Sequence, residues 1–177
     1  MKQRLDHSVS LSAFAHLFSE IVQYQSTRIQ TAADLECRLE ECGHSVGLRI
    51  LELLSHRERR VKHEIQIVGA LQFVSSHCWK ALFGKVADSL ERSTENENEY
   101  MIHETFPVTN QYVSVPPDLG HLNCAAYIAG VASGILDGAN FSARVTAHTI
   151  SSAEDSGDKT VFLIKFSPEV IHRETYV

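Results

Sequence analysis

The apolar residues in the first third of the chain follow a helical period. They recur at spacings of three and four along residues 11–25 and again along residues 31–56, with polar and charged residues between them. Ser10 and Thr31 stand just before these stretches, and serine and threonine are favoured N-cap residues. Asp34 occupies the capping-box position of the second stretch. The pattern therefore predicts two amphipathic helices.

The two predicted helices carry an apolar seam that needs a neighbour to cover it. Six side chains represent the seam: Phe14, Phe18, Ile21, Leu35, Leu39 and Val46. The seam either packs inside the domain against a third helix or binds a partner protein. The pattern alone favours neither interpretation.

The middle of the chain changes from helical to extended patterns. Residues 64–83 are apolar almost all round, which is typical of a helix inside a domain, and Gly84 ends this stretch. Residues 89–99 are acidic and predict a solvated connection. Strands are predicted over residues 100–105, 111–115, 141–148 and 160–166. Helices first, then strands, then a helix between strands indicate an α+β fold.

One predicted helix, over residues 122–138, consists mostly of small residues. Ala126, Gly130 and Gly134 recur every fourth residue and form a ridge with almost no side chain, which continues to Gly138. Glycine costs roughly 1 kcal/mol relative to alanine inside a helix. We therefore expect this ridge to pack closely against the backbone of a sheet or another helix, and the helix to lie against the strand that follows it.

Composition and charge narrow the class of protein. Of the 177 residues, 44% are hydrophobic and 21% are charged, and the net charge of −6 argues against a general affinity for nucleic acid. Residues 1–9 are polar, lack the apolar segment of a signal peptide and predict a flexible terminus before one domain over residues 10–177. The four cysteines form no C-x-x-C pair. We expect a reduced, cytoplasmic protein.

Candidate chemistry is sparse. No nucleophile–base pair, phosphate-binding loop or H-E-x-x-H motif is present, and His121 with Cys124 offers two of the roughly four donors that a zinc site needs. We predict no enzyme activity, no metal and no cofactor. A basic run stands out in this acidic chain: Arg57, Arg59, Arg60 and Lys62. It is interpreted first as a solvated loop, and second as a contact for an anionic membrane or an acidic partner.

Four stretches in a fixed order carry a resemblance to a known family. They are VGLRILE (residues 46–52), WKALFGK (79–85), YVSVP (112–116) and the run from NCAAY (123–127) to VTAH (145–148). With these stretches, roughly residues 10–170 resemble the small subunits of the transport protein particle (TRAPP), the vesicle-tethering complex of ER-to-Golgi transport.

The resemblance implies an α/β plait, with helices packed on one side of an antiparallel sheet of about four strands. It implies that the first two helices form a heterodimer with other TRAPP small subunits, which favours the partner interpretation of the seam. In the family, other subunits form the exchange-factor surface for a Rab-family GTPase. This chain would then be a non-catalytic structural subunit, cytoplasmic and peripheral at the cis-Golgi and endoplasmic reticulum.

The resemblance also bears on acylation and on a second function. The acylated family member has a cysteine between its second and third helices, whereas residues 56–63 contain none and Cys78 lies too far along the next helix. We therefore predict no acylation, although an apolar pocket near Phe73 and Trp79 is compatible with the pattern. The alternative function is a small-ligand or lipid-binding sensor module of the vinyl-reductase type, which shares the plait.

Overall fold

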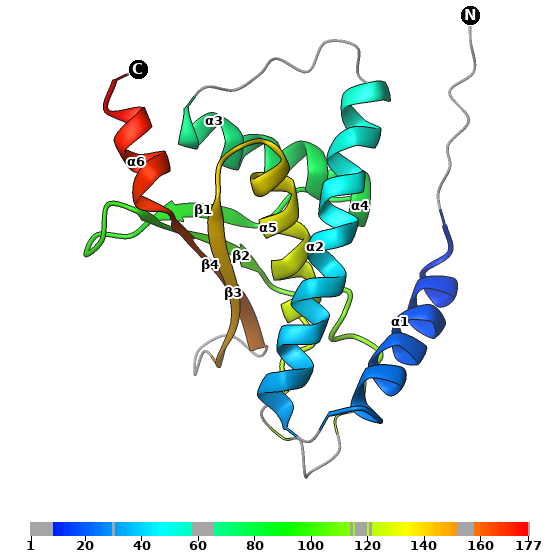
Figure 1. Ribbon diagram of the computed structural model, residues 1–177. Helices are drawn as coiled ribbons and strands as arrows, with labels where there is room; N and C mark the ends of the chain where they lie inside the picture. Colours follow the sequence, from blue (N-terminus) through cyan, green and yellow to red (C-terminus); the bar gives the residue numbers. More distant parts are fainter. Residues whose placement is uncertain are drawn as a thin grey trace, which may run out of the picture.

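The computed structural model describes residues 9–29, 31–57, 66–113, 115, 120, 122–151 and 158–176, without the side chains of residues 151 and 158. Predictions for residues 1–8, and for Arg59, Arg60 and Lys62, lie outside this part of the chain. The elements follow in this order (Figure 1): α1 (Leu11–Ser26), α2 (Ala32–Arg57), α3 (Ile67–Gln72), the π-helix η1 (Phe73–Cys78), α4 (Trp79–Phe83), β1 (Ser89–Arg92), β2 (Glu99–Glu104), α5 (Ala126–Gly138), β3 (Ala143–Ser151), β4 (Asp158–Phe166) and α6 (Pro168–Glu174).

Local capping positions the first two helices as predicted. The Ser10 hydroxyl accepts a hydrogen bond from the Ala13 amide at 3.3 Å, so α1 begins where the sequence indicates. The Thr31 hydroxyl accepts from the Asp34 amide at 3.2 Å and donates to the Asp34 carboxylate at 2.7 Å. These bonds satisfy donors that the first turn of a helix leaves free. The expected extents of both helices are confirmed to within two residues.

The predicted third helix is not one regular helix. Residues 67–83 form α3, η1 and α4 in succession, because the chain switches to π-helical hydrogen bonding at Phe73 and back at Trp79. Ile67, Leu71, Val74 and Trp79 are buried as expected, but Val68 is 45% exposed, so the stretch is not buried all round. Gly84 ends it in the left-handed region with φ 75°. The apolar pattern indicated burial here, but it carries no signal for the π-helical segment.

The sheet is antiparallel and has the order β1-β2-β4-β3. Strands at residues 100–105, 141–148 and 160–166 are confirmed with shifted ends. The strand predicted at 111–115 is wrong, since the described residues 111–113 and 115 are not extended in the sheet. Residues 89–92, expected in a solvated connection, form β1 instead.

The physical reason for the β1 error is a turn hidden in an acidic stretch. The Ser93 hydroxyl accepts from the amides of Glu95 and Asn96, both at 3.3 Å, and so folds the polar residues into a hairpin turn. Leu90 packs against the core, which supplies the single apolar position that a short edge strand needs. The polar and acidic residues of the turn dominate the composition of residues 89–99, so this composition gives no indication of β1.

The layers follow from the apolar faces of the elements. Figure 1 shows α5 between the sheet and α2, with α1 on the outer side of the molecule. The main core joins α3, η1, α4 and α5 to the inward side chains of β2, β3 and β4. The Ser133 hydroxyl on α5 donates to the Ala143 carbonyl at 3.0 Å, which fixes this helix to the strand that follows it. The fold is α+β, with these helices on one side of a four-stranded antiparallel sheet.

The small-residue ridge of α5 meets α2. A Cβ atom added at Gly130 would lie 2.1 Å from the Glu40 carbonyl oxygen, and one at Gly134 would lie 2.2 Å from the His44 carbonyl oxygen. Ala126, at the start of α5, is buried beside Leu35. The two helices are therefore in backbone contact along the ridge.

The contact is reciprocal, because α2 has small residues of its own facing α5. A Cβ atom at Gly43 would lie 2.1 Å from the Tyr127 carbonyl oxygen, and one at Gly47 would lie 2.2 Å from the Val131 carbonyl oxygen. Sequence reasoning missed this pair, although its spacing of four residues was a usable signal. Two glycine pairs thus allow the helix axes to approach one another.

Candidate functional site

The predicted seam is largely covered by the chain itself. Phe18, Leu35 and Leu39 are fully buried and, with Cys124 and Ala126, form a hydrophobic cluster separate from the main core. Phe14 and Ile21 are half-buried at its edge, and Val46 is half-buried against the main core.

The cover comes from the start of α5 rather than from the third helix. The Phe18 ring lies edge-on to the Tyr127 ring with centroids 5.4 Å apart, and the Phe14 ring stacks on Phe18 at 5.7 Å. Phe18, Leu35 and Leu39 are therefore already covered within the chain itself. Assignment of the six residues to a partner surface stays a prediction.

The apolar side chains that α1 does expose are different ones. Leu17 is 62% exposed and Tyr24 is 54% exposed, seven residues apart and hence on one face of the helix. The Arg28 guanidinium lies 4.0 Å from the centre of the Tyr24 ring. The sequence pattern did not indicate this face, because the apolar residues of α1 with the more regular helical spacing are Phe14, Phe18 and Ile21.

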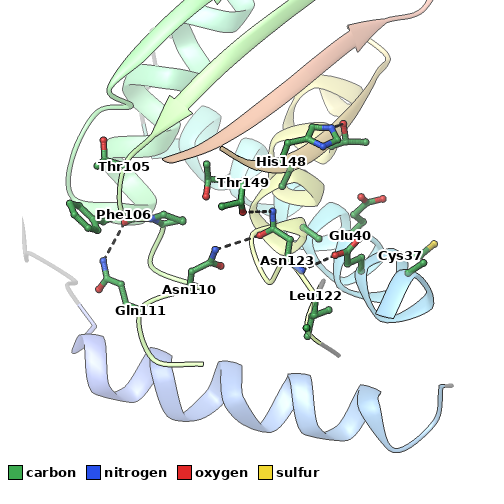
Figure 2. Close-up of a pocket in the computed structure, with 18 of the residues that line it drawn as sticks. Cys37, Glu40, Thr105, Phe106, Asn110, Gln111, Leu122, Asn123, His148 and Thr149 are labelled. Carbon is green, nitrogen blue, oxygen red and sulfur yellow. Dashed lines mark hydrogen bonds between the residues drawn. The ribbon is translucent and has the colours of Figure 1, made fainter. Parts of the chain in front are cut away.

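A groove of about 950 Å³ opens between the N-terminal half of α2 and β3. One wall is the α2 face with Ala33, Glu36, Cys37 and Glu40, and the other includes Arg144 and residues 146–149 of β3. In Figure 2, Phe106, Asn110 and Gln111 of the connection after β2 stand across the groove from Glu40 and Cys37.

Asn123 joins the elements around this groove. Its backbone amide donates to the Glu36 carboxylate at 2.7 Å, and its side-chain amide donates to the Thr149 hydroxyl at 3.3 Å (Figure 2). Its side-chain oxygen accepts from the Ala125 amide at 3.0 Å and from Asn110 at 3.5 Å. One residue thus links α2, β3 and the start of α5.

The charges in the groove are unequal. Glu36 and Glu40 lie one helical turn apart, and Arg144 provides a cation opposite them. Burial raises the pKa of the Glu40 carboxyl, Arg144 lowers it in part, and the Glu36 charge raises it further. Burial, assisted by Glu36, also raises the pKa of the Cys124 thiol to about 11. This thiol is therefore protonated and unreactive at neutral pH.

A buried carboxylate organises the end of the third helix. Glu104 on β2 is 3% exposed, accepts a hydrogen bond from the Trp79 indole nitrogen at 3.0 Å and forms an ion pair with Lys85. The stretch WKALFGK thus brings its first and last residues to one acceptor. We assign this cluster to stability, because Trp79 is packed between Phe83 and Phe162.

The remaining predicted site residues carry no assembled chemistry. Arg57 is exposed at the end of α2. No group of three or more metal-ligating side chains occurs among the described residues. In the same part of the chain, no helix is both long and apolar enough to cross a membrane.

Comparison with known proteins identifies the family. Residues 14–167 match the sequence model of the transport protein particle (TRAPP) component family. The chain belongs to this family. Trafficking protein particle complex subunit 5 of Dictyostelium discoideum is 50% identical over 165 residues, covering 93% of this chain and 89% of that protein. Subunit 5 of Bos taurus is 43% identical over 166 residues, covering 94% and 85%.

A solved structure supports the TRAPP fold. Subunit 3 from Naegleria fowleri, covalently bound to palmitic acid, matches with a TM-score of 0.73 and 17% identity, covering 89% of this chain and 95% of that one. At this identity the likeness concerns the fold alone. Together these matches favour the TRAPP family over the sensor-module alternative.

Proposed function

We propose that this chain is a non-catalytic structural subunit of the TRAPP vesicle-tethering complex, acting in transport between the endoplasmic reticulum and the Golgi. It forms a heterodimer with another TRAPP small subunit through α1 and α2. Support comes from its family and from relatives that are named as subunits of the trafficking protein particle complex.

One observation carries the pairing surface: α1 exposes Leu17 and Tyr24 on one face. Phe14 and Ile21 are half-buried on the same helix and can lose further surface on pairing. The other members of the seam belong to the proposed pairing region of α1 and α2 as its internal support: Phe18, Leu35 and Leu39 are buried in one cluster, and Val46 is half-buried against the main core. Apolar side chains exposed in line on a helix are typical of a surface that another protein covers.

The chain acts on a Rab-family GTPase only through the assembled complex. It is a cytoplasmic protein, held at cis-Golgi and endoplasmic reticulum membranes peripherally, without a cofactor and without nucleic acid. Arg57, Arg59, Arg60 and Lys62 are candidates for a contact with the anionic surface of these membranes, because lysine and arginine clusters are attracted to anionic lipids. Residues 10–177 act as one domain.

Acylation does not extend to this chain in our proposal. The subunit from Naegleria fowleri carries palmitic acid covalently. Here residues 56–63 contain no cysteine, and Cys78 is fully buried in η1. Near Phe73 and Trp79, the Trp79 ring packs edge-on against Phe162 with ring centroids 5.7 Å apart.

The pairing is tested by co-expressing the chain with another TRAPP small subunit and measuring the mass of the product by analytical ultracentrifugation. The wild type is expected to form a one-to-one pair. Leu17→Asp is expected to weaken pairing by at least about a hundredfold, because it buries a carboxylate without a counter-charge. Phe18→Asp would be a poorer test, since Phe18 is buried within the chain and its replacement also disturbs folding.

Ser19→Asp is the matched control, because Ser19 is exposed on α1 about 200° around the helix from Leu17. It adds the same charge and should pair as the wild type does. Unchanged pairing of Leu17→Asp, with an unchanged melting temperature, would show that this face of α1 is not the partner surface.

A further inference from the structure

We propose that the groove beside β3 binds an extended segment of a partner protein, which adds a strand to the free edge of β3 and places a lysine or arginine against Glu36 and Glu40. This surface is separate from the exposed face of α1, so the proposal goes beyond the pairing function. Strand addition is a common mode of peptide recognition, in which main-chain hydrogen bonds supply affinity and side-chain contacts supply specificity.

The first support is the edge itself. β3 is nine residues long and lies at the end of the sheet order, whereas β1 at the opposite edge has four residues and carries Glu91 and Arg92. Proteins usually protect edge strands by making them short, by adding proline, lysine or a bulge, or by covering them. Arg144, near the beginning of β3, is a charged residue of this kind, but residues 145–151 contain no proline and no Lys, Arg, Asp or Glu, so most of this long edge lacks those protections.

The second support is the state of the backbone along the edge. Ser133 occupies the carbonyl of Ala143, at the beginning of the strand. Between that residue and Ile150, β4 is the element whose backbone pairs with β3, and no other described residue hydrogen-bonds to the β3 backbone. Within the described part of the chain, the outward-facing donors and acceptors over the middle of β3 therefore have no backbone partner.

The third support is the shape of the groove. The α2 residues that line it, from Ala33 through Cys37 to Glu40, recur at helical spacing and so present one face alongside the strand. The volume of about 950 Å³ is at the upper end of the range for ligand sites, which suits a short peptide segment. Phe106 is exposed and lines the groove where it passes the end of β2.

The charge of the groove selects the partner. Two carboxylates on the α2 wall face one guanidinium, that of Arg144, and His148 is the remaining titratable group on β3. The pKa of the Glu40 carboxyl is raised. Burial and the charge of Glu36 both raise this pKa, and together they outweigh the lowering by Arg144. A cationic side chain from the partner would balance this excess negative charge.

The test selects random decapeptides by phage display on the purified full chain, alone or in its co-expressed pair, with counter-selection on Cys37→Trp. Cys37 is exposed and lines the groove, so tryptophan fills the space without altering the core. Ala33→Trp is the second blocking variant, used if Cys37→Trp does not fold. Arg38→Trp is the matched control, exposed on the same helix but outside the groove.

Selected peptides are synthesised, and their affinities are measured by fluorescence anisotropy. They should contain a lysine or arginine, bind Cys37→Trp and Glu40→Gln at least about tenfold more weakly, and bind Arg38→Trp as they bind the wild type. Failure to enrich any peptide over the blocked variant would overturn the proposal. So would peptides whose affinity is the same for Glu40→Gln and the wild type.

Strand addition has two further signatures. N-methylation of alternate peptide residues should abolish binding in one register and leave the other unaffected, since one edge of the peptide pairs with β3. Hydrogen exchange should slow at residues 144–150 when the peptide binds and stay unchanged at β1. Equal effects of both N-methylation registers, or protection elsewhere, would contradict the proposal and leave the α1 pairing, tested with Leu17→Asp, untouched.

Discussion

The backbone amide of Asn123 donates to the Glu36 carboxylate at 2.7 Å, although 87 positions separate the two residues. This bond ties the approach to α5 to the N-terminal part of α2, next to the glycine contact between the same helices. The Asn123 amide lies before the first residue of α5, so no carbonyl group within the helix accepts a hydrogen bond from it. Glu36 therefore satisfies a half-buried donor that the local backbone leaves free.

Glu36→Ala should lower the free energy of unfolding by about 1–3 kcal/mol, because it leaves the Asn123 amide without its acceptor. Glu41→Ala is the control: Glu41 lies on the same helix, is exposed and pairs only with Arg38 among the described residues. Its effect should stay below about 1 kcal/mol. Urea denaturation measures both, and equal effects would show that the bond to Asn123 contributes no stability.

Gly130→Ala should destabilise the fold by at least about 1–3 kcal/mol, since its Cβ would overlap the Glu40 carbonyl. Gly130→Leu should be more severe. The gain in helix propensity, roughly 1 kcal/mol, opposes this effect but does not outweigh a clash with backbone. Gly138→Ala is the control, because its Cβ would meet the flexible ends of Leu48 and Leu51. Thermal melts followed by circular dichroism decide, and an unchanged melting temperature for Gly130→Ala would exclude backbone contact.

Glu40→Gln should slightly stabilise the protein at pH 7, because glutamine removes a charge that is unfavourable in this partly buried position. The folded-state pKa of Glu40 is raised, so its ionised form costs stability above that pKa, and the cost disappears as the pH falls through it to the unfolded value. The difference between variant and wild type should therefore shrink toward pH 4. Denaturation of both proteins at pH 7 and at pH 4 measures this difference. A stability difference, variant minus wild type, that is smaller at pH 7 than at pH 4 would contradict the prediction.

Cysteine labelling should distinguish one exposed thiol from two buried ones. Cys37 is exposed and should react with maleimide at pH 7.5 within minutes, whereas Cys78 and Cys124 are buried and should react only after denaturation. The raised pKa of Cys124 adds to its protection, because the thiolate is the reactive form. Peptide mass spectrometry reads each site. Rapid labelling of Cys124 in the folded chain would show that α1, whose Phe18 packs in the same cluster, readily moves away from Cys124.

Features set by short-range interactions were predictable from the sequence. Ser10 and Thr31 mark the starts of α1 and α2 because a cap bonds to an amide three residues away, and a helical stripe shows in the spacing of its own residues. The α5 ridge was equally visible, since glycine is costly inside a helix. The α+β order followed from these local patterns.

Tertiary structure decided whatever depends on distant neighbours. The sheet contains β1 at residues 89–92 and no strand at the predicted residues 111–115, as far as these are described. Pairing with β2 and the turn at Ser93 outweigh the local composition of residues 89–92. The same holds for Phe18, which Tyr127 covers, and for the bond between Asn123 and Glu36. A pattern along the chain states that a side chain will be buried or paired, but its partner is chosen by long-range packing, which only the assembled fold contains.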